Sequence, residues 1–277
     1  MVKVLMNPKF KTHKSRYKVL EKNTRKGMYI DGYLQSNLDH VYKNVTKNDF
    51  DSFIVITGRE GFGKSTIAAQ IATFLDPTYN INRCCFTAEQ FEEACITAGK
   101  FKAVVFDETM GYLSSRGAMS KFNRGLIKIM SEMRSKNLFC ILCIPNFFEL
   151  DRYPAIHRST GLIHVYKRGA FGSYDYNTKK KLYLLGKKTY SYSVTPNFIG
   201  RYVDYFPLPK EEYESKKQVA INDWVASSSK EKKYQKQRDI LIEYLHKEKK
   251  ETQQKISELI GVTKQYINFL LGKLDNE

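Results

Sequence analysis

The chain has little of what marks membrane, secreted or zinc-binding proteins. Its longest apolar stretch, residues 138–148, is far shorter than the roughly 20 residues that span a bilayer, so no membrane segment is expected. No apolar leader follows Met1, and a cytoplasmic location is therefore predicted. The 5 cysteines are an odd number without zinc-ligand spacing to histidines. Cys140 and Cys143 lie within an apolar run, which predicts two buried thiols on a strand.

Acidic residues are also scarce. The 277 residues include 46 Lys and Arg against 29 Asp and Glu, a formal net charge of +17, while a hydrophobic content of 42% allows a packed interior. A basic excess of this size predicts a polyanionic partner. Nine of the basic residues and a single acidic residue, Glu21, fall within residues 1–26. We therefore expect a basic N-terminal arm over residues 1–48.

A second basic cluster lies between residues 179 and 188 and is interleaved with tyrosines. Lysines neutralise phosphates and tyrosines stack on bases, so the cluster predicts contact with nucleic acid. A hairpin at a sheet edge, kept soluble by its lysines, is the alternative. The residues are Lys179, Lys180, Lys181, Lys187 and Lys188, with Tyr174, Tyr176, Tyr183, Tyr190 and Tyr192.

Apolar runs alternate with segments of helical spacing between residues 51 and 166. Short apolar runs bounded by turn residues predict strands, and apolar residues three and four apart predict helices. An α/β fold follows, with a mostly parallel sheet between helices. The expected strands are 51–57, 82–86, 103–107, 138–144 and 161–166, and the expected helices are 64–75, 88–98 and 119–133.

Beyond residue 166 the pattern changes. Short β-like segments at 182–185, 189–192 and 201–206 are separated by Gly and Pro turns, which predicts a β-hairpin extension. Three serines at 227–229 indicate a polar linker. The expected divisions are the arm at 1–48, an α/β core at 49–168, a β-rich extension and linker at 169–227, and a small helical domain at 228–277.

Residues 58–65 read Gly-Arg-Glu-Gly-Phe-Gly-Lys-Ser and match the phosphate-loop pattern G-x-x-x-x-G-K-[ST] between a predicted strand and a predicted helix. Glycines let backbone N–H groups surround phosphate oxygens at the helix N-terminus. Lys64 is expected to reach the β- and γ-phosphates, and Ser65 to bind Mg²⁺. A glycine-rich turn without a ligand is the alternative. The expected nucleotide contacts are Gly58, Arg59, Glu60, Gly61, Phe62, Gly63, Lys64, Ser65 and Thr66.

A later apolar run ends in two adjacent acidic residues, Asp107 and Glu108. Asp107 is expected to hold Mg²⁺, and Glu108 to polarise the water that attacks the γ-phosphate. The pair predicts an ATPase. The sequence has no N-K-x-D motif for reading guanine, so ATP is the expected nucleotide. Asn146 follows the next apolar run and is expected to contact the γ-phosphate or the attacking water, or else to cap the helix after Pro145.

With these motifs, residues 53–165 resemble the FtsK-HerA superfamily of DNA-pumping P-loop ATPases, which includes viral packaging motors, conjugative transfer ATPases and Zot-like phage proteins. The resemblance implies a RecA-like core, and a homo-oligomer, typically a hexamer, with ATP at subunit interfaces. If the chain is viral, it would act in the host cytoplasm. In this family the last strand usually ends in Gln, a position that Asn146 takes here.

The same resemblance implies an arginine finger. Arg134 matches the arginine before the last strand of the family, and Arg158 matches one before the next strand. Either would stabilise charge on the γ-phosphoryl oxygens of a neighbouring subunit's ATP. Arg116 is a third candidate, and a surface ion pair is the alternative for each.

Residues 253–274 place apolar residues where two helices would pack across a turn at Gly261. The segment resembles a helix-turn-helix, with residues 234–245 as the preceding helix, and FtsK motors are similar in ending with a winged helix. The N-terminal part of the second helix would enter a DNA major groove, although such domains also dock on proteins. The expected DNA contacts are Lys264, Gln265, Tyr266 and Asn268.

Together these features predict an ATP-hydrolysing DNA translocase, or a genome-packaging or DNA-transfer motor, that grips DNA mainly through the phosphate backbone. Two alternatives stay open. One is an AAA+-type replication initiator or helicase loader, in which a helical lid usually follows the core instead of a β-rich segment. The other is a DNA-binding regulator that uses ATP as a switch. Acceleration of ATP turnover by long duplex DNA would separate the motor from both.

Overall fold

The computed structural model describes residues 4–6, 28–108 and 116–274, so most of the basic segment 1–26 lies outside the described residues. The chain divides into two compact units, residues 1–220 and residues 221–277. Among the helices of the described ranges, none is long and apolar enough to cross a membrane.

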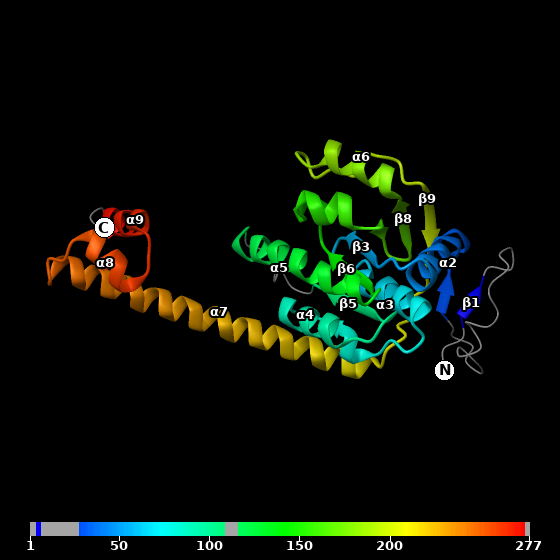
Figure 1. The fold of residues 1–277 in the computed structure, drawn as a ribbon, viewed down its shortest axis with the longest axis horizontal. Helices are drawn as coiled ribbons and strands as arrows, with labels where there is room; N and C mark the ends of the chain where they lie inside the picture. The colour runs from blue at the N-terminus through cyan, green and yellow to red at the C-terminus, as the bar shows by residue number, and fades with distance from the viewer. Residues whose placement is uncertain (1–3, 7–27, 109–115, 275–277) are drawn as a thin grey trace. The chain divides into compact units, whose positions relative to one another are not determined.

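The first unit is built on a seven-stranded sheet with the strand order β4-β5-β6-β3-β7-β8-β9 (Figure 1). Neighbouring strands from β4 to β7 are parallel, whereas β8 runs antiparallel to both β7 and β9. The predicted α/β fold with a mostly parallel sheet is therefore confirmed. The strands are β3 (Ser52–Gly58), β4 (Cys84–Cys85), β5 (Ala103–Asp107), β6 (Phe139–Ile144), β7 (Gly161–Lys167), β8 (Ala170–Tyr174) and β9 (Phe198–Arg201), and a separate parallel pair is β1 (Val4–Met6) with β2 (Met28–Ile30).

Both faces of this sheet carry an apolar core, because alternate residues of each strand point to opposite sides. In β3, Ile54 and Ile56 join one core with α2 and α3, while Phe53 and Val55 join the other with α4, α5 and α6. The helices are α2 (Gly32–Lys47), α3 (Lys64–Leu75), α4 (Ala88–Thr97), α5 (Arg116–Ser135) and α6 (Tyr176–Gly186), with short turns at Ile81–Arg83, Phe147–Glu149 and Tyr153–Arg158.

The cysteines are buried, as expected for strand residues, and all five are free thiols. Cys140 and Cys143 lie on opposite faces of β6, one in each apolar core, so they cannot form a pair. Cys140 instead has its sulfur 4.0 Å from that of Cys95 on α4. The prediction of two buried thiols on a strand is confirmed.

The segment 182–185, expected to be β-like, is helical and forms the second half of α6. The carboxylate of Asp175 caps this helix by accepting a hydrogen bond from the backbone N–H of Thr178 at 2.9 Å. Local capping and a buried face outweigh the β-propensity of the short apolar run. The buried residues of α6 are Lys179, Leu182, Tyr183 and Gly186, which recur at the three- and four-residue spacing of a helix.

The β-hairpin lies earlier in the sequence than the segments predicted to form it. The hairpin is formed by β7 and β8, and β9 adds a third antiparallel strand. Residues 189–192 form no strand, and of the expected strand at 201–206 only Arg201 belongs to β9. The β-rich extension is therefore smaller than its Gly and Pro turns suggested.

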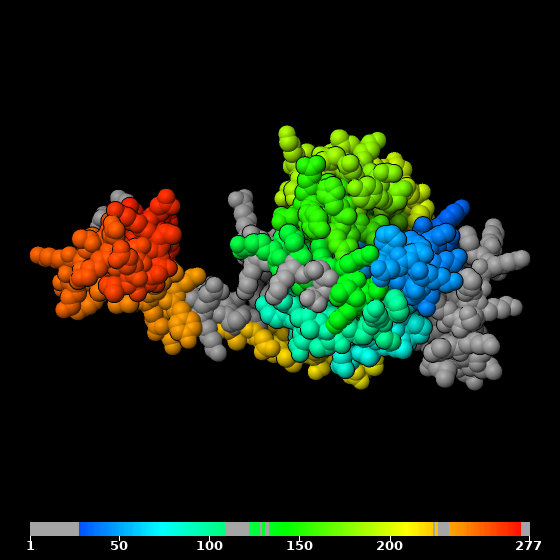
Figure 2. Space-filling model, viewed as in Figure 1, coloured from blue at the N-terminus to red at the C-terminus, as the bar shows by residue number. Residues whose placement is uncertain are grey.

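Residues 28–47, expected within the basic arm, are part of the first unit (Figure 2). Leu34 and Leu38 of α2 are buried in the same apolar core as α3. Asp31 begins the helix, since its carboxylate accepts hydrogen bonds from the backbone N–H groups of Tyr33 at 3.0 Å and Leu34 at 3.3 Å. The basic arm therefore does not extend to residue 48.

The polar run 227–229, expected to be a linker, lies inside the 38-residue helix α7 (Lys210–Lys247). Serine in a helix interior costs only about 0.5 kcal/mol relative to alanine, and the neighbouring Lys, Glu and Gln residues favour helix. A serine run alone therefore does not end this helix.

The second unit consists of the end of α7 followed by α8 (Gln253–Ile260) and α9 (Lys264–Leu274). Thr252 caps α8, and Gly261 ends it in the left-handed conformation, φ 72°. These are the helices and the turn that the sequence predicted. A small apolar core holds them together, formed by Ile242, Ile256, Ile267 and Leu271.

Candidate nucleotide-binding site

The phosphate-loop motif connects β3 to α3 at the carboxyl edge of the parallel strands. Its glycines are required by the backbone. Gly61 and Gly63 have φ of 75° and 92°, and a Cβ on Gly58, at φ 144°, would lie 2.3 Å from the carbonyl oxygen of Val165 on β7. Gly63 is also approached closely, because an added Cβ would lie 2.6 Å from the hydroxyl of Tyr202. The loop therefore has the backbone course of a phosphate loop only with these glycines.

Lys64 occupies the centre of this loop. Its ammonium group is buried and donates hydrogen bonds to the carbonyl oxygens of Gly58 at 2.8 Å and Arg59 at 3.2 Å. A buried cation enclosed by a turn at a helix N-terminus is a strong site for anions, because the helix dipole and the charge act together.

Asp107 ends β5 beside the loop and is 2% exposed. The hydroxyl of Tyr213, on α7, donates a hydrogen bond to its Oδ2 at 2.7 Å. Burial raises the pKa of Asp107, and hydrogen bonds with Ser65 and Tyr213 partly offset that rise. Glu108 is also buried, and its backbone N–H donates to the carbonyl oxygen of Cys143 at 3.1 Å. The sheet order β5-β6-β3 thus brings the two predicted acidic residues to the edge that carries the phosphate loop.

The site opens into a cavity of about 760 Å³, which is large enough for a nucleotide. The phosphate loop, Asp107 and Glu108 form one wall. The other wall was not foreseen from the sequence and contributes cations close to the loop, including Arg168, whose Nε lies 3.3 Å from the carbonyl oxygen of Gly61. This wall consists of Arg168, Asp204, Phe206, Lys210, Tyr213, Glu214 and Lys217.

A signal for this wall does exist in the sequence. Lys210, Tyr213, Glu214 and Lys217 recur at three- and four-residue steps and therefore share one face of α7. What the sequence could not show is where that face docks.

Asn146 follows β6 at the same edge of the sheet, next to Pro145, whose carbonyl oxygen accepts a hydrogen bond from the backbone N–H of Gly58 at 3.3 Å. Oδ1 of Asn146 accepts a hydrogen bond from the backbone N–H of Phe148 at 3.1 Å, so the Asn146 side chain caps the short turn that follows. Capping is the alternative that the sequence left open, and contact with a γ-phosphate stays a prediction.

A tyrosine ties this strand tip to β3 and β7. The hydroxyl of Tyr192 accepts a hydrogen bond from the backbone N–H of Phe147 at 3.0 Å and donates to Thr57 Oγ1 at 3.2 Å. Its ring stacks on His164 with centroids 3.7 Å apart. Burial lowers the pKa of His164 to about 4, so the imidazole is neutral near pH 7 and bonds Thr57 through Nδ1 at 3.1 Å. This network, absent from the sequence predictions, holds the residues just before the phosphate loop.

The predicted arginine fingers lie at the opposite edge of the sheet. Arg158 pairs with Asp51, which directly precedes β3, and donates to the carbonyl oxygen of Met130 at 3.0 Å. Arg134 is 3.7 Å from the carboxylate of Asp49 and lies over the ring of Phe50. The length of β3, about 20 Å, separates both from the phosphate loop of their own chain. Arg134 forms the surface ion pair that the sequence left as an alternative, whereas the pair of Arg158 with Asp51 is buried, and the side chain of Arg116 lies outside the described residues.

The Lys and Tyr cluster at 179–188 does not form one exposed surface. Lys179 is fully buried, and its ammonium group donates to the carbonyl oxygen of Ile156 at 3.2 Å and to Ser159. Lys187 donates to the carbonyl oxygens of Phe148 and Leu150. Of the tyrosines, Tyr174 and Tyr183 are buried, which prevents them from stacking on bases. The exposed members are Lys180, Lys181, Lys187, Lys188, Tyr176 and Tyr190.

On α9, three of the four predicted DNA contacts, Lys264, Gln265 and Asn268, are exposed. Tyr266 differs, because its hydroxyl bonds the carboxylate of Asp239 at 2.9 Å and Nη2 of Arg238 at 2.5 Å. Tyr266 therefore fastens α9 to α7 within the second unit.

No family model matches the chain, and a search of curated proteins finds no match.

Among the residues that the structure describes, no group of three or more His, Cys, Asp or Glu side chains could hold a metal ion by itself. Ser65 and Asp107 line the same cavity beside the phosphate loop, and together they offer one hydroxyl and one carboxylate. Such a donor set fits Mg²⁺, which takes few protein ligands and completes its shell with water and phosphate oxygens.

Proposed function

We propose that the chain is a Mg²⁺-dependent ATPase that acts on DNA, as a translocase or as a packaging or transfer motor. One observation carries the proposal: Lys64 lies inside a glycine-rich loop at a helix N-terminus, with Ser65, Asp107 and Glu108 around the same cavity. Phosphates attract cations and backbone N–H groups, while a metal ion needs the hydroxyl and carboxylate oxygens beside them.

Each residue has a distinct task in this reaction. Lys64 would exchange its bonds to the carbonyl oxygens of Gly58 and Arg59 for bonds to the β- and γ-phosphates. Ser65 and Asp107 would hold Mg²⁺, which neutralises charge on the phosphates. Glu108 would accept a proton from the attacking water while the new O–P bond forms and the bond between the γ-phosphorus and the β–γ bridging oxygen breaks, releasing ADP and phosphate.

A cation is needed to stabilise the charge on the γ-phosphoryl group, and Arg158 lies away from the phosphate loop of its own chain. Because Arg158 is held by Asp51 within its own chain, we infer that Arg168, Lys210 and Lys217 supply positive charge in cis. A ring with ATP between subunits is compatible with this arrangement, but hydrolysis does not depend on Arg158 from a neighbour.

Two further features support action on DNA. The net charge of +17 favours a polyanionic partner, and α9 exposes Lys264, Gln265 and Asn268 on a short helix that follows a turn, as in a helix-turn-helix. The AAA+ alternative is less favoured, since residues 161–201 continue the sheet with antiparallel strands β8 and β9. A helical lid would be expected there in that class.

The test is a pair of substitutions. Glu108→Gln keeps the size of the side chain but removes the base, so the variant should bind a fluorescent ATP analogue like the wild type and release no phosphate. Lys64→Ala should lose binding itself, because the loop then has no cation. Normal hydrolysis by Glu108→Gln would show that another group activates the water, and normal binding by Lys64→Ala would contradict a phosphate site in this loop.

A further inference from the structure

The first turns of α7 reach into the candidate nucleotide site. Tyr213 is only 5% exposed, and its hydroxyl donates to Oδ2 of Asp107 at 2.7 Å although 106 residues separate the two. The ring is held edge-on by Phe86 and Phe206, with centroids 5.2 and 4.7 Å away. These contacts fix the ring plane and therefore aim the hydroxyl.

A second contact fixes this part of α7 along the sheet edge. The ammonium group of Lys216 donates to the carbonyl oxygens of Ile81 at 2.9 Å, Asn82 at 3.4 Å and Cys84 at 2.7 Å. Three carbonyl oxygens around one ammonium group satisfy all of its donors. Two sets of contacts thus fix Tyr213. Its aromatic neighbours hold the ring, and the hydrogen bonds of Lys216 hold the helical turn that carries it.

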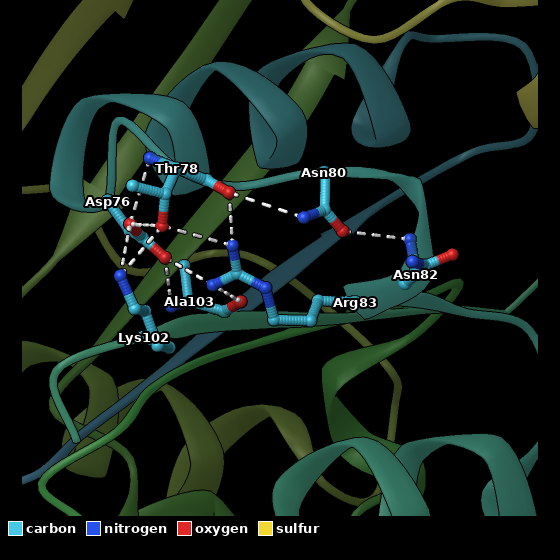
Figure 3. Close-up of polar contacts among 7 residues, drawn as sticks. All are labelled: Asp76, Thr78, Asn80, Asn82, Arg83, Lys102 and Ala103. Carbon is cyan, nitrogen blue, oxygen red and sulfur yellow. Dashed lines mark hydrogen bonds and ion pairs between the residues drawn. The ribbon is translucent and has the colours of Figure 1, made fainter. Parts of the chain in front are cut away.

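The loop that receives Lys216 is itself braced (Figure 3). Asp76 accepts hydrogen bonds from the backbone N–H groups of Thr78 and Ala103, both at 3.0 Å, and pairs with Arg83. Burial raises the pKa of Asp76, but the hydrogen bonds from the Thr78 hydroxyl, at 2.7 Å, and from the Ala103 backbone, together with Arg83, outweigh it, so the pKa is lowered. A permanently ionised carboxylate therefore holds the loop in place.

The consequence for Asp107 follows from its two oxygens. Tyr213 donates to Oδ2, which restrains rotation of the carboxylate and leaves Oδ1 available as a ligand oxygen. A phenolic hydroxyl carries its proton near neutral pH and therefore remains a donor to the carboxylate. Outer partners of this kind orient a metal ligand without touching the metal.

We propose that Tyr213 is a positioning residue for Mg²⁺ at this site: its hydroxyl orients the Asp107 carboxylate, so the first turns of α7 take part in binding the Mg²⁺-nucleotide complex. This inference rests on the proposed function. It adds to that function a residue outside the motifs, on a helix that begins the connection to the second unit.

The experiment compares Tyr213→Phe with the wild type in the full chain. A fluorescent ATP analogue is bound first in EDTA and then across a Mg²⁺ titration. We expect Tyr213→Phe to raise the Mg²⁺ concentration at half-maximal binding about tenfold, the usual loss for an outer partner of a metal ligand, while affinity in EDTA stays unchanged. The phenylalanine ring keeps the packing on Phe86 and Phe206, and thermal unfolding verifies that the variant is folded.

Tyr202→Phe is the matched control. The hydroxyl of Tyr202 donates to the carbonyl oxygen of Phe62 in the phosphate loop, so this variant also loses one tyrosine bond at the site but none to Asp107. Any change in its nucleotide affinity should be the same in EDTA and in Mg²⁺, so the ratio of the two affinities should match the wild type. In an Asp107→Asn background, Tyr213→Phe should cause no further change, because the carboxylate it orients is gone.

The outcomes separate the inference from the proposed function. A wild-type Mg²⁺ midpoint in folded Tyr213→Phe overturns the positioning role and leaves the ATPase proposal standing. An equal shift in Tyr202→Phe overturns it as well, because the effect would then not pass through Asp107. If the wild type binds no nucleotide with or without Mg²⁺, the proposed function fails first.

Discussion

Arg158 holds the buried carboxylate of Asp51 with both of its terminal nitrogens, Nη1 lying 3.0 Å from Oδ1 and Nη2 contacting Oδ2. The pair joins the end of the turn before β7 to the residue before β3, the middle strand of the seven-stranded sheet. An arginine in this position stabilises the core of its own chain. Its place in the sequence, ahead of a strand, fits a finger equally well, and only the partner distinguishes the two roles.

Arg158→Ala should therefore act on stability. Removing one partner of a buried pair leaves Asp51 charged and uncompensated, which costs about 3 kcal/mol of unfolding free energy. Urea denaturation followed by circular dichroism measures the change. Arg134→Ala is the matched control, because its partner Asp49 is exposed, and it should cost less than about 1 kcal/mol. A fully stable Arg158→Ala protein that no longer hydrolyses ATP would instead support Arg158 as an arginine finger.

The stability of the fold should depend on pH through Lys179, and the lowered pKa of its ammonium group sets the sign of that dependence. Burial lowers its pKa from 10.5 to about 8, so between about pH 8 and 10.5 the unfolded chain binds more protons than the folded one. Stability from this group therefore rises with pH across that window, by at most about 3 kcal/mol, and the gain is absent below pH 8.

The measurement is the difference in unfolding free energy between the wild type and Lys179→Met at pH 7.5, 9 and 10. Using the difference cancels the titration of tyrosines, which is common to both proteins. The unfolding free energy of the wild type should increase relative to that of Lys179→Met as the pH rises. Lys180→Met, an exposed neighbour, should run parallel to the wild type. A constant difference between wild type and Lys179→Met would mean that Lys179 stays charged in the core.

DNA contacts through α9 predict a change in salt dependence. Lys264→Ala should weaken binding to duplex DNA about fivefold and lower the slope of log affinity against log salt by about one, for one lost phosphate contact. Lys255→Ala removes an exposed lysine from α8, where it pairs with Glu251, and should change neither. Fluorescence anisotropy at several salt concentrations provides both quantities. Equal effects of the two substitutions would argue against α9 as the contact.

Tyr266 has a different expected outcome in the same assay. Because its hydroxyl bonds Asp239 and Arg238, Tyr266→Phe should destabilise the second unit while leaving the exposed residues of α9 unchanged. At temperatures where that unit stays folded, DNA affinity should match the wild type.

The parts of the fold that local pattern determines could be predicted. Apolar runs buried on both faces predicted the parallel strands, and the strand-loop-helix context located the phosphate loop around Lys64. The position of Asp107 and Glu108 beside it followed from the rule that parallel strands present their carboxyl ends at one edge. In each case the apolar run and the functional residues at its end lie close together in the sequence, so local pattern is enough to locate them.

The parts of the fold that depend on contacts between residues far apart in the sequence could not be predicted. Nothing near Tyr213 in the sequence indicates that its hydroxyl meets Asp107, because the contact arises from packing of α7 on the sheet. Lys179 was expected at a surface, yet Asp175 begins a helix that turns it inward onto Ser159. That helical spacing was visible in the sequence but competed with an apolar run that resembled a strand.

The rate of phosphate release from Mg²⁺-ATP, measured with and without long linear duplex DNA, tests the central claim most directly. A DNA motor should hydrolyse ATP slowly alone and several times faster with the duplex, and Glu108→Gln should release none in either condition. A rate that the duplex leaves unchanged would contradict a motor, and the absence of any Glu108-dependent release would contradict the ATPase itself.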